Sequence, residues 1–395
     1  MPEAPANPSG WLPGRTGPVR RPRFHVGLGF RSRFFRALRT NQKGLVLKPM
    51  ATAADVSAAL KGLHEHPDDH GWHPFYEVLE KLFGAEEIAG GGPLSRIVNA
   101  CYESRPNLTA PHFVTLLCIV LKGLVGDWRD SPVFDLEVAV DRRAAVLKVE
   151  IDANEKVILE GVLTRQNSFS SARRFLIPQV LISHFAARAG MSVRLADLGT
   201  GAGLLPRQLN SRSNYQRFAP DLVWQDWDPP FVEVPYEVRW GVDRISAGDT
   251  AWFRQCYGPS TYYDRLYAEL DWAFAQPEVG ATTLHPADLD LLGPDKLSRF
   301  LQEQRINVVT CSYVLYQYEA PAREAVVAAV VSALPEPGLF VSLEPTRDLL
   351  DPGAVIRAYL PGDPTPIEVG IVSNGHCLGG VAPGKGFPGF RRDYL

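Results

Sequence analysis

The sequence is poor in cysteine and lacks the patterns that cysteine-dependent sites need. Five cysteines occur in 395 residues, and no two of them form a C-x-x-C pair: Cys101, Cys118, Cys256, Cys311 and Cys377. An odd and scattered set argues against a disulfide framework or a zinc knuckle and fits a reducing cytosol. No histidines among His70, His73 and His112 have the i, i+4 spacing of a helical metal site, so we predict no metal.

Long apolar runs are also missing. The longest, FVTLLCIVL, is interrupted by Lys122 and falls far short of the ~20 residues that a membrane span needs. The first residues, MPEAPANPSGWLPG, contain no apolar signal core. We therefore expect a cytoplasmic protein without a membrane segment.

Acidic residues are absent between Glu3 and Asp55. Ten Arg or Lys occupy this stretch, Arg36 and Arg39 among them. The block is either a solvated tail or a surface for an anionic partner, such as an acidic carrier protein or charged groups of the substrate. The net charge of −3 and the lack of a recognisable nucleic-acid module argue against nucleic acid. We expect residues 1–50 to form a basic, partly disordered arm.

The rest of the chain has the composition of a folded protein, with 45% hydrophobic and 22% charged residues. Apolar residues at three- and four-residue spacing predict helices over 52–126. Residues 134–163 alternate or are β-branched, which predicts a short antiparallel β meander with a turn at 152–155. We therefore expect a helical domain with this meander over 51–166.

From about residue 190 strand and helix patterns alternate. This rhythm predicts an α/β domain over 167–395, built on a doubly wound, mostly parallel sheet. Near the end, Asn374-Gly375 separates two apolar segments, which predicts a closing β-hairpin.

The strongest motif is Asp197-Leu-Gly199-Thr-Gly201-Ala-Gly203, at the junction of a predicted strand and helix. Glycines permit a tight turn and let a ligand approach the backbone. A dinucleotide fingerprint would need a third glycine at position 204 or 206, where Leu and Pro stand, and no P-loop Gly-Lys-Ser/Thr follows.

The motif resembles the first signature of class I S-adenosylmethionine-dependent methyltransferases, acid-x-G-x-G-x-G, over all seven residues. The resemblance extends over roughly 190–390 and implies a Rossmann-like methyltransferase sheet with S-adenosylmethionine as cofactor. It implies a cofactor site lined by Asp197, Gly199, Gly201 and Gly203, with Asp243 on the ribose and Asp288 on the adenine amine. GVDRISAGDTAWFRQCYGP and VVTCSYVLYQY are similar to a largely actinobacterial group of methyltransferase-like proteins.

The residues expected to bind the methyl acceptor are less clearly marked in the sequence than the glycine motif. Tyr313, Gln317 and neighbouring tyrosines follow the fourth predicted strand and could shape a substrate pocket or belong to the core. The candidate bases are His285, Tyr316 and Glu344, although an in-line methyl transfer can proceed through alignment alone. The aromatic insertion at 211–237 is either a lid over the site or a surface insertion.

Three functions fit the sequence. The first is methyl transfer to a small molecule, in specialised natural-product metabolism. The second is a biosynthetic enzyme of the same fold that has lost methyl transfer and catalyses another displacement, such as elimination or ring closure, on a substrate or acidic carrier protein. The third is a non-catalytic binding subunit.

Overall fold

The computed structural model describes residues 52–65, 71–243, 250–346 and 353–395. Residues 50–395 form one compact unit. The predicted basic arm at 1–50, including Arg36 and Arg39, lies outside the described residues.

Helices occupy the first part of the described chain, as the apolar spacing predicts. Their inward faces share one core, in which Phe75, Leu79 and Phe113 are buried. Proline at the first or second position starts three of the helices, where its missing N–H costs no hydrogen bond. The helices are α1 (Ala53–His64), α2 (His73–Ala89), α3 (Pro93–Ser104), α4 (Ala110–Leu124) and α5 (Val140–Thr164).

The predicted β meander at 134–163 is wrong, because α5 takes up most of this segment. Leu147, Ile151 and Ile158 are buried at spacings of four and seven residues, which is the period of a helix face. The strand prediction rested on the β-branched residues of this segment, which are common in strands, and it overlooked the helical spacing. The expected turn survives only as a kink at Asn154, whose backbone is non-helical and whose Nδ2 donates to the Glu150 carbonyl oxygen at 2.9 Å.

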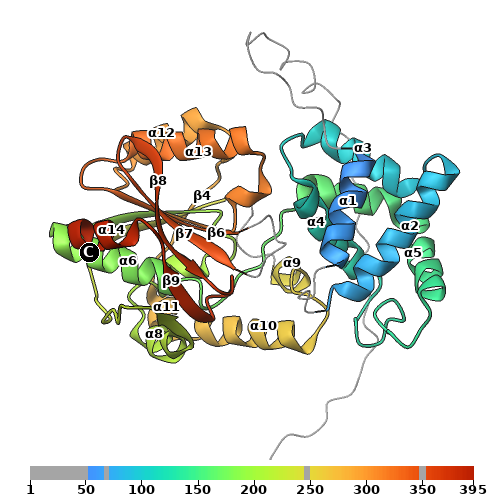
Figure 1. The fold of residues 1–395 in the computed structure, drawn as a ribbon, viewed down its shortest axis with the longest axis horizontal. Helices are drawn as coiled ribbons and strands as arrows, with labels where there is room; N and C mark the ends of the chain where they lie inside the picture. Colours follow the sequence, from blue (N-terminus) through green and yellow to red (C-terminus); the bar gives the residue numbers. More distant parts are fainter. Residues whose placement is uncertain (1–51, 66–70, 244–249, 347–352) are drawn as a thin grey trace, which may run out of the picture. The chain divides into compact units, whose positions relative to one another are not determined.

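In the described part of the remaining chain, a nine-stranded sheet with helices around it confirms the predicted α/β class (Figure 1). The strand order is β2-β9-β8-β7-β6-β5-β1-β3-β4. The neighbouring strands β6, β5, β1, β3 and β4 pair in parallel. The neighbouring strands β6, β7, β8 and β9 pair antiparallel. The strands are β1 (Val193–Leu198), β2 (Leu222–Trp224), β3 (Tyr236–Val242), β4 (His285–Ala287), β5 (Val308–Ser312), β6 (Leu339–Pro345), β7 (Ala354–Leu360), β8 (Asp363–Val372) and β9 (Gly379–Pro383).

The closing hairpin is confirmed as the antiparallel pair β8–β9, which flanks Asn374-Gly375. A further strand that the sequence patterns did not predict, β7, pairs with both β6 and β8. The antiparallel part is therefore a meander of four strands and not a hairpin alone.

Helices cover both faces of the sheet, as doubly wound folds require. In β1, Val193 and Leu195 belong to one core and Ala196 and Leu198 to the other, because successive side chains alternate between the faces. Figure 1 shows α12 (Pro294–Glu303) and α13 (Ala320–Ala333) over one face and α6 (Leu176–Ala189) and α14 (Phe387–Tyr394) over the other. The remaining helices are α7 (Leu204–Gln208), α8 (Arg212–Phe218), η1 (Ala219–Asp221), α9 (Thr250–Gln255), α10 (Thr261–Phe274), α11 (Pro277–Ala281) and η2 (Leu315–Gln317).

The strand order places a switch point beside β1. After β1 the chain first forms β2 at the far edge of the sheet, then β3 and β4 on one side of β1, and it then returns to β5 on the other side of β1. Ligands of doubly wound sheets bind outside the carboxyl ends of the strands at such a point. The glycine motif follows β1 directly, so the topology puts it at this position.

Candidate functional site

The glycine turn after β1 uses backbone conformations that side chains disfavour. Gly199, Gly201 and Gly203 have φ angles of 69°, 52° and 72°. A Cβ on Gly199 would lie 2.2 Å from Val314 Cγ2, so this glycine is also needed for packing. A Cβ on Gly201 would have only Ser170 Oγ nearby, at 3.6 Å. Gly201 therefore borders open space, into which a larger side chain would project.

Asp197, at the end of β1, is buried and tied to the neighbouring strand. The Thr310 hydroxyl of β5 donates to Asp197 Oδ1 at 2.7 Å. Burial raises the pKa of Asp197 to about 7, although the Thr310 hydrogen bond opposes the rise. Asp197 thus helps to fix the glycine turn against β5 and holds its proton close to neutral pH.

We expect Asp197→Asn to change how stability depends on pH. The folded-state pKa of Asp197 lies above its unfolded value, so the folded chain keeps this proton while the unfolded chain releases it, and stability falls as pH rises from about 4 to 7. Asparagine does not titrate, so the variant lacks this pH-dependent contribution to stability. The difference in unfolding free energy between wild type and variant should therefore change by roughly 2–4 kcal/mol over that window, measured by chemical denaturation. Asp288→Asn, the same change at an exposed acid, is the control and should leave the pH dependence unaltered.

Asp243 reaches the glycine turn from the end of β3. Its Oδ2 accepts a hydrogen bond from the Gly201 backbone N–H at 2.9 Å, and its own N–H donates to the Ala287 carbonyl oxygen at 3.1 Å. The long insertion before β3 has therefore not displaced this acid from the turn. Asp288 is different, because it is exposed and is not part of the pocket lining; Asp290, two residues later, lines the pocket.

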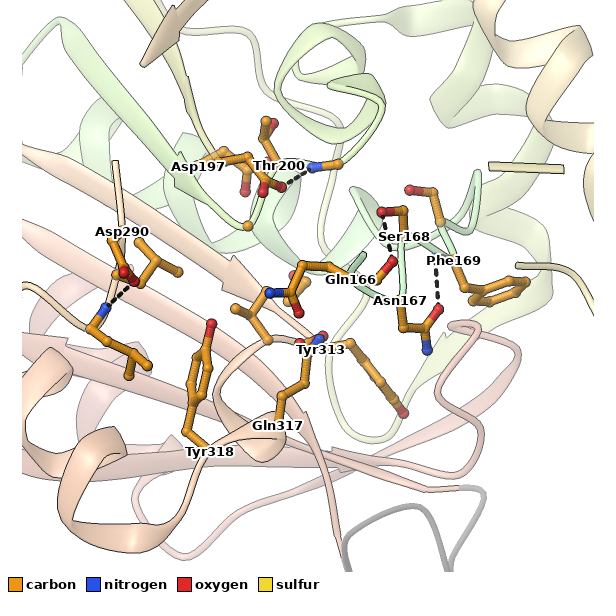
Figure 2. A pocket seen from close by; sticks show the side chains of 18 of the residues that line it. Gln166, Asn167, Ser168, Phe169, Asp197, Thr200, Asp290, Tyr313, Gln317 and Tyr318 are labelled. Atoms are coloured by element: carbon orange, nitrogen blue, oxygen red, sulfur yellow. Dashed lines mark hydrogen bonds between the residues drawn. The ribbon is translucent and has the colours of Figure 1, made fainter. Parts of the chain in front are cut away.

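A cavity of ≈ 280 Å³ opens at the carboxyl ends of β1, β3 and β5 (Figure 2). The glycine turn and Asp243 form one wall. The segments 104–108 and 166–171 form another, and they come from the ends of α3 and α5 in the helical region. Neither segment was predicted from the sequence. The only signal was a polar run in the second of them, Gln166-Asn-Ser-Phe-Ser-Ser171, between two predicted elements.

Two of the predicted substrate residues lie in this cavity. Tyr313 and Gln317 both line it, and Gln317 Nε2 donates to the Tyr313 carbonyl oxygen at 3.1 Å (Figure 2). Tyr313 has a φ of 57°, a strained value for a residue with a large side chain. A Cβ on Gly375 would lie 1.7 Å from the Tyr313 hydroxyl, so the absence of a side chain at Gly375 makes room for the ring.

The three candidate bases lie outside the cavity lining. His285 is exposed on β4, with its ring 5.1 Å from that of Trp240. Tyr316 is buried and its ring packs against His112 at 5.8 Å. These positions remove both residues from contact with a ligand in the cavity, and they correct the sequence-based expectation.

Glu344 is also misassigned, because its carboxylate is used within the fold. Its Oε1 accepts from the backbone N–H groups of Val314 at 3.2 Å and Leu315 at 3.1 Å, and its Oε2 accepts from that of Tyr316 at 3.1 Å. Burial raises its pKa to about 7, while these three hydrogen bonds oppose the rise. Glu344 therefore holds the turn that places Tyr313 and Gln317 at the cavity.

The insertion at 211–237 packs into the core of the sheet domain, where Phe218, Leu222 and Val234 are buried, and does not cover this cavity. It contributes no residue to the cavity lining, and its β2 pairs with β9 at the edge of the sheet farthest from β3 and β4. Trp227 packs against Phe387 of α14, with ring centroids 5.4 Å apart. The lid interpretation is therefore wrong for this site.

In the described ranges, no helix is both long enough and apolar enough to cross a membrane. Those ranges also hold no cluster of three or more His, Cys, Asp or Glu side chains suited to a metal ion.

Comparisons with known proteins give only distant similarities. No protein-family model and no curated protein sequence matches this chain. An N-methyltransferase from Bradyrhizobium japonicum in complex with S-adenosyl-L-homocysteine is 13% identical, with 43% of this chain and 59% of that one covered and a TM-score of 0.22. An amino pentose methyltransferase of calicheamicin biosynthesis from Micromonospora echinaspora, bound to S-adenosylmethionine, is 15% identical, with 49% and 64% covered and a TM-score of 0.22.

An O-methyltransferase family protein from Burkholderia thailandensis is 13% identical, with 74% of this chain and 75% of that one covered and a TM-score of 0.26. The matched region spans less than two thirds of the Bradyrhizobium and Micromonospora chains. At these TM-scores the similarities establish neither the activity of this chain nor its ligand.

Proposed function

We propose that this chain is an S-adenosylmethionine-dependent methyltransferase that acts on a small molecule. The observation that carries the proposal is the contact of Asp243 with Gly201, which joins the glycine turn of β1 to the acid of β3 beside the cavity. A carboxylate at this place can accept hydrogen bonds from a ribose diol. Two further acids line the cavity beside the buried Asp197, and the negative charge of Asp243 and Asp290 suits a ligand with a sulfonium and an amino group.

The residues fit the cofactor in shape as well as charge. Gly201 presents only backbone to the cavity, so a ligand can lie against it. When bound, S-adenosylmethionine supplies an electrophilic methyl group on a sulfonium sulfur. Tyr313 and Gln317 lie at the end of β5 and shape the side from which an acceptor would approach. In-line transfer needs alignment and exclusion of water, and the segments 104–108 and 166–171 help to enclose the cavity for this purpose.

The finer parts of the proposal stay predictions from the sequence. They are a role in specialised natural-product metabolism, membership of the largely actinobacterial methyltransferase-like group, and a cytoplasmic location. A carrier-protein partner for the basic arm concerns residues outside the described ranges and stays a prediction from the sequence.

Calorimetry with S-adenosylmethionine and S-adenosylhomocysteine tests the proposal. We expect both ligands to bind wild type, and Asp243→Ala to weaken binding by roughly 1–3 kcal/mol, since charge-assisted hydrogen bonds to the ligand and to Gly201 are lost. Asp288→Ala removes an exposed acid outside the cavity and is the matched control. Failure of both ligands to bind at millimolar concentration would favour the other two functions, a different displacement or a non-catalytic subunit. Equal affinity of Asp243→Ala and wild type would remove Asp243 from the site.

A further inference from the structure

Arg174 stands apart from the other buried arginines of the described chain. Three arginines are buried there, and Arg174 is 7% exposed. Arg143 pairs with Glu77, and Arg173 pairs with Asp221 and Glu269. Arg174 makes no ion pair with any described carboxylate, although burial of a cation without a partner is costly.

The hydrogen bonds of Arg174 leave much of the guanidinium unused. Its Nε donates to the Gly375 carbonyl oxygen and its Nη1 to the Phe169 carbonyl oxygen, both at the long distance of 3.3 Å. Arginine has five N–H donors, and among the described residues Nη2 has no hydrogen-bond partner. Arg174 also lines the cavity, so these donors are within reach of a ligand there.

Two aromatic rings lie close to the guanidinium. Its Cζ lies 4.1 Å from the ring centroid of Tyr313 and 5.4 Å from that of Phe169. Such cation–π contacts leave N–H groups of the guanidinium for hydrogen bonding, and its planar fork matches the two oxygens of a carboxylate. The ring contacts and the two backbone hydrogen bonds restrict how the fork of N–H donors can turn.

The location favours the acceptor over the cofactor as the source of the carboxylate. Arg174 contacts Tyr313, just beyond β5, and Gly375, in the β8–β9 connection. The contacts around Gly201 come instead from Ser170 and Asp243. We propose that the methyl acceptor carries a carboxylate group and that Arg174 binds this group; this inference rests on the proposed function. The same chemistry would serve the methionine carboxylate of the cofactor, and the experiment below separates the two sources.

The test compares benzoate with benzamide, which have similar shape and differ in charge. Binding of each is measured by calorimetry on the full chain, first saturated with S-adenosylhomocysteine and then without it. We expect wild type to bind benzoate at least tenfold more tightly than benzamide. Arg174→Gln should abolish this preference and leave the affinity for S-adenosylhomocysteine within twofold of wild type. Arg188→Gln removes an exposed charge remote from the cavity and should change neither value.

Arg174→Lys covers the case in which Arg174→Gln does not fold. Lysine keeps the positive charge but lacks the planar fork of N–H donors, so this variant should still prefer benzoate to benzamide, by a smaller ratio of affinities than wild type. The proposal is overturned if wild type shows no preference, if Arg174→Gln keeps it, or if Arg174→Gln weakens S-adenosylhomocysteine tenfold while benzoate binding is unchanged. In the last case Arg174 binds the cofactor. If wild type binds no S-adenosylhomocysteine but still distinguishes the two probes through Arg174, the carboxylate site stands and the proposed function fails.

Discussion

Gly201→Val should abolish binding of S-adenosylhomocysteine while the chain stays folded. The Gly201 φ of 52° is unfavourable for a β-branched residue, and the nearest atom to an added Cβ is 3.6 Å away, so the valine methyls would project into the cavity. We expect the affinity to fall by at least a factor of about 100, or roughly 3 kcal/mol. Calorimetry measures the loss, and circular dichroism verifies the fold.

Gly90→Val is the matched control for backbone strain. Gly90 ends α2 with a φ of 78° and has no atom within 4 Å of an added Cβ, so valine is strained there without filling a cavity. This variant should lose stability and keep its affinity for S-adenosylhomocysteine. Unchanged affinity in folded Gly201→Val would place the cofactor elsewhere.

Glu344→Ala should cause the largest loss of stability. The substitution leaves three buried backbone N–H groups, those of Val314, Leu315 and Tyr316, without their acceptor. Breaking such a buried network costs about 3–5 kcal/mol of unfolding free energy, which chemical denaturation measures. Glu344→Gln keeps one carbonyl oxygen as an acceptor and should lose less.

Glu336→Ala removes an exposed carboxylate shortly before β6 and should have little effect on stability. The same variants separate a positioning role from a catalytic one. If Glu344→Gln is as stable as wild type and binds S-adenosylhomocysteine normally but transfers no methyl group, Glu344 acts as a base after all. A fall in stability that accompanies the fall in activity supports its role in holding the turn at 313–318.

Local sequence patterns were sufficient to locate the glycine turn because that turn is local in the chain. Asp197 to Gly203 is a strand, a tight turn and the start of a helix, and each residue type is required by the backbone at its own position. Asp243 follows β3 and was singled out by the family resemblance, which expects an acid at the end of that strand. The meander at 134–163 failed because β-branched residues occur on helices as well, and only their burial reveals the helical period of α5.

The part of the cavity around Arg174 could not be read from the chain because its residues are distant in sequence. Arg174, Tyr313 and Gly375 lie in three separate segments that only the folded sheet brings together. In sequence, Glu344 is a candidate base; in the fold, its carboxylate accepts hydrogen bonds from three backbone N–H groups. The sequence by itself determined the class of fold and the glycine turn, since both depend on neighbouring residues. The tertiary structure decided which polar groups are already paired and which buried cation still faces the cavity, because pairing and burial depend on contacts between distant parts of the chain.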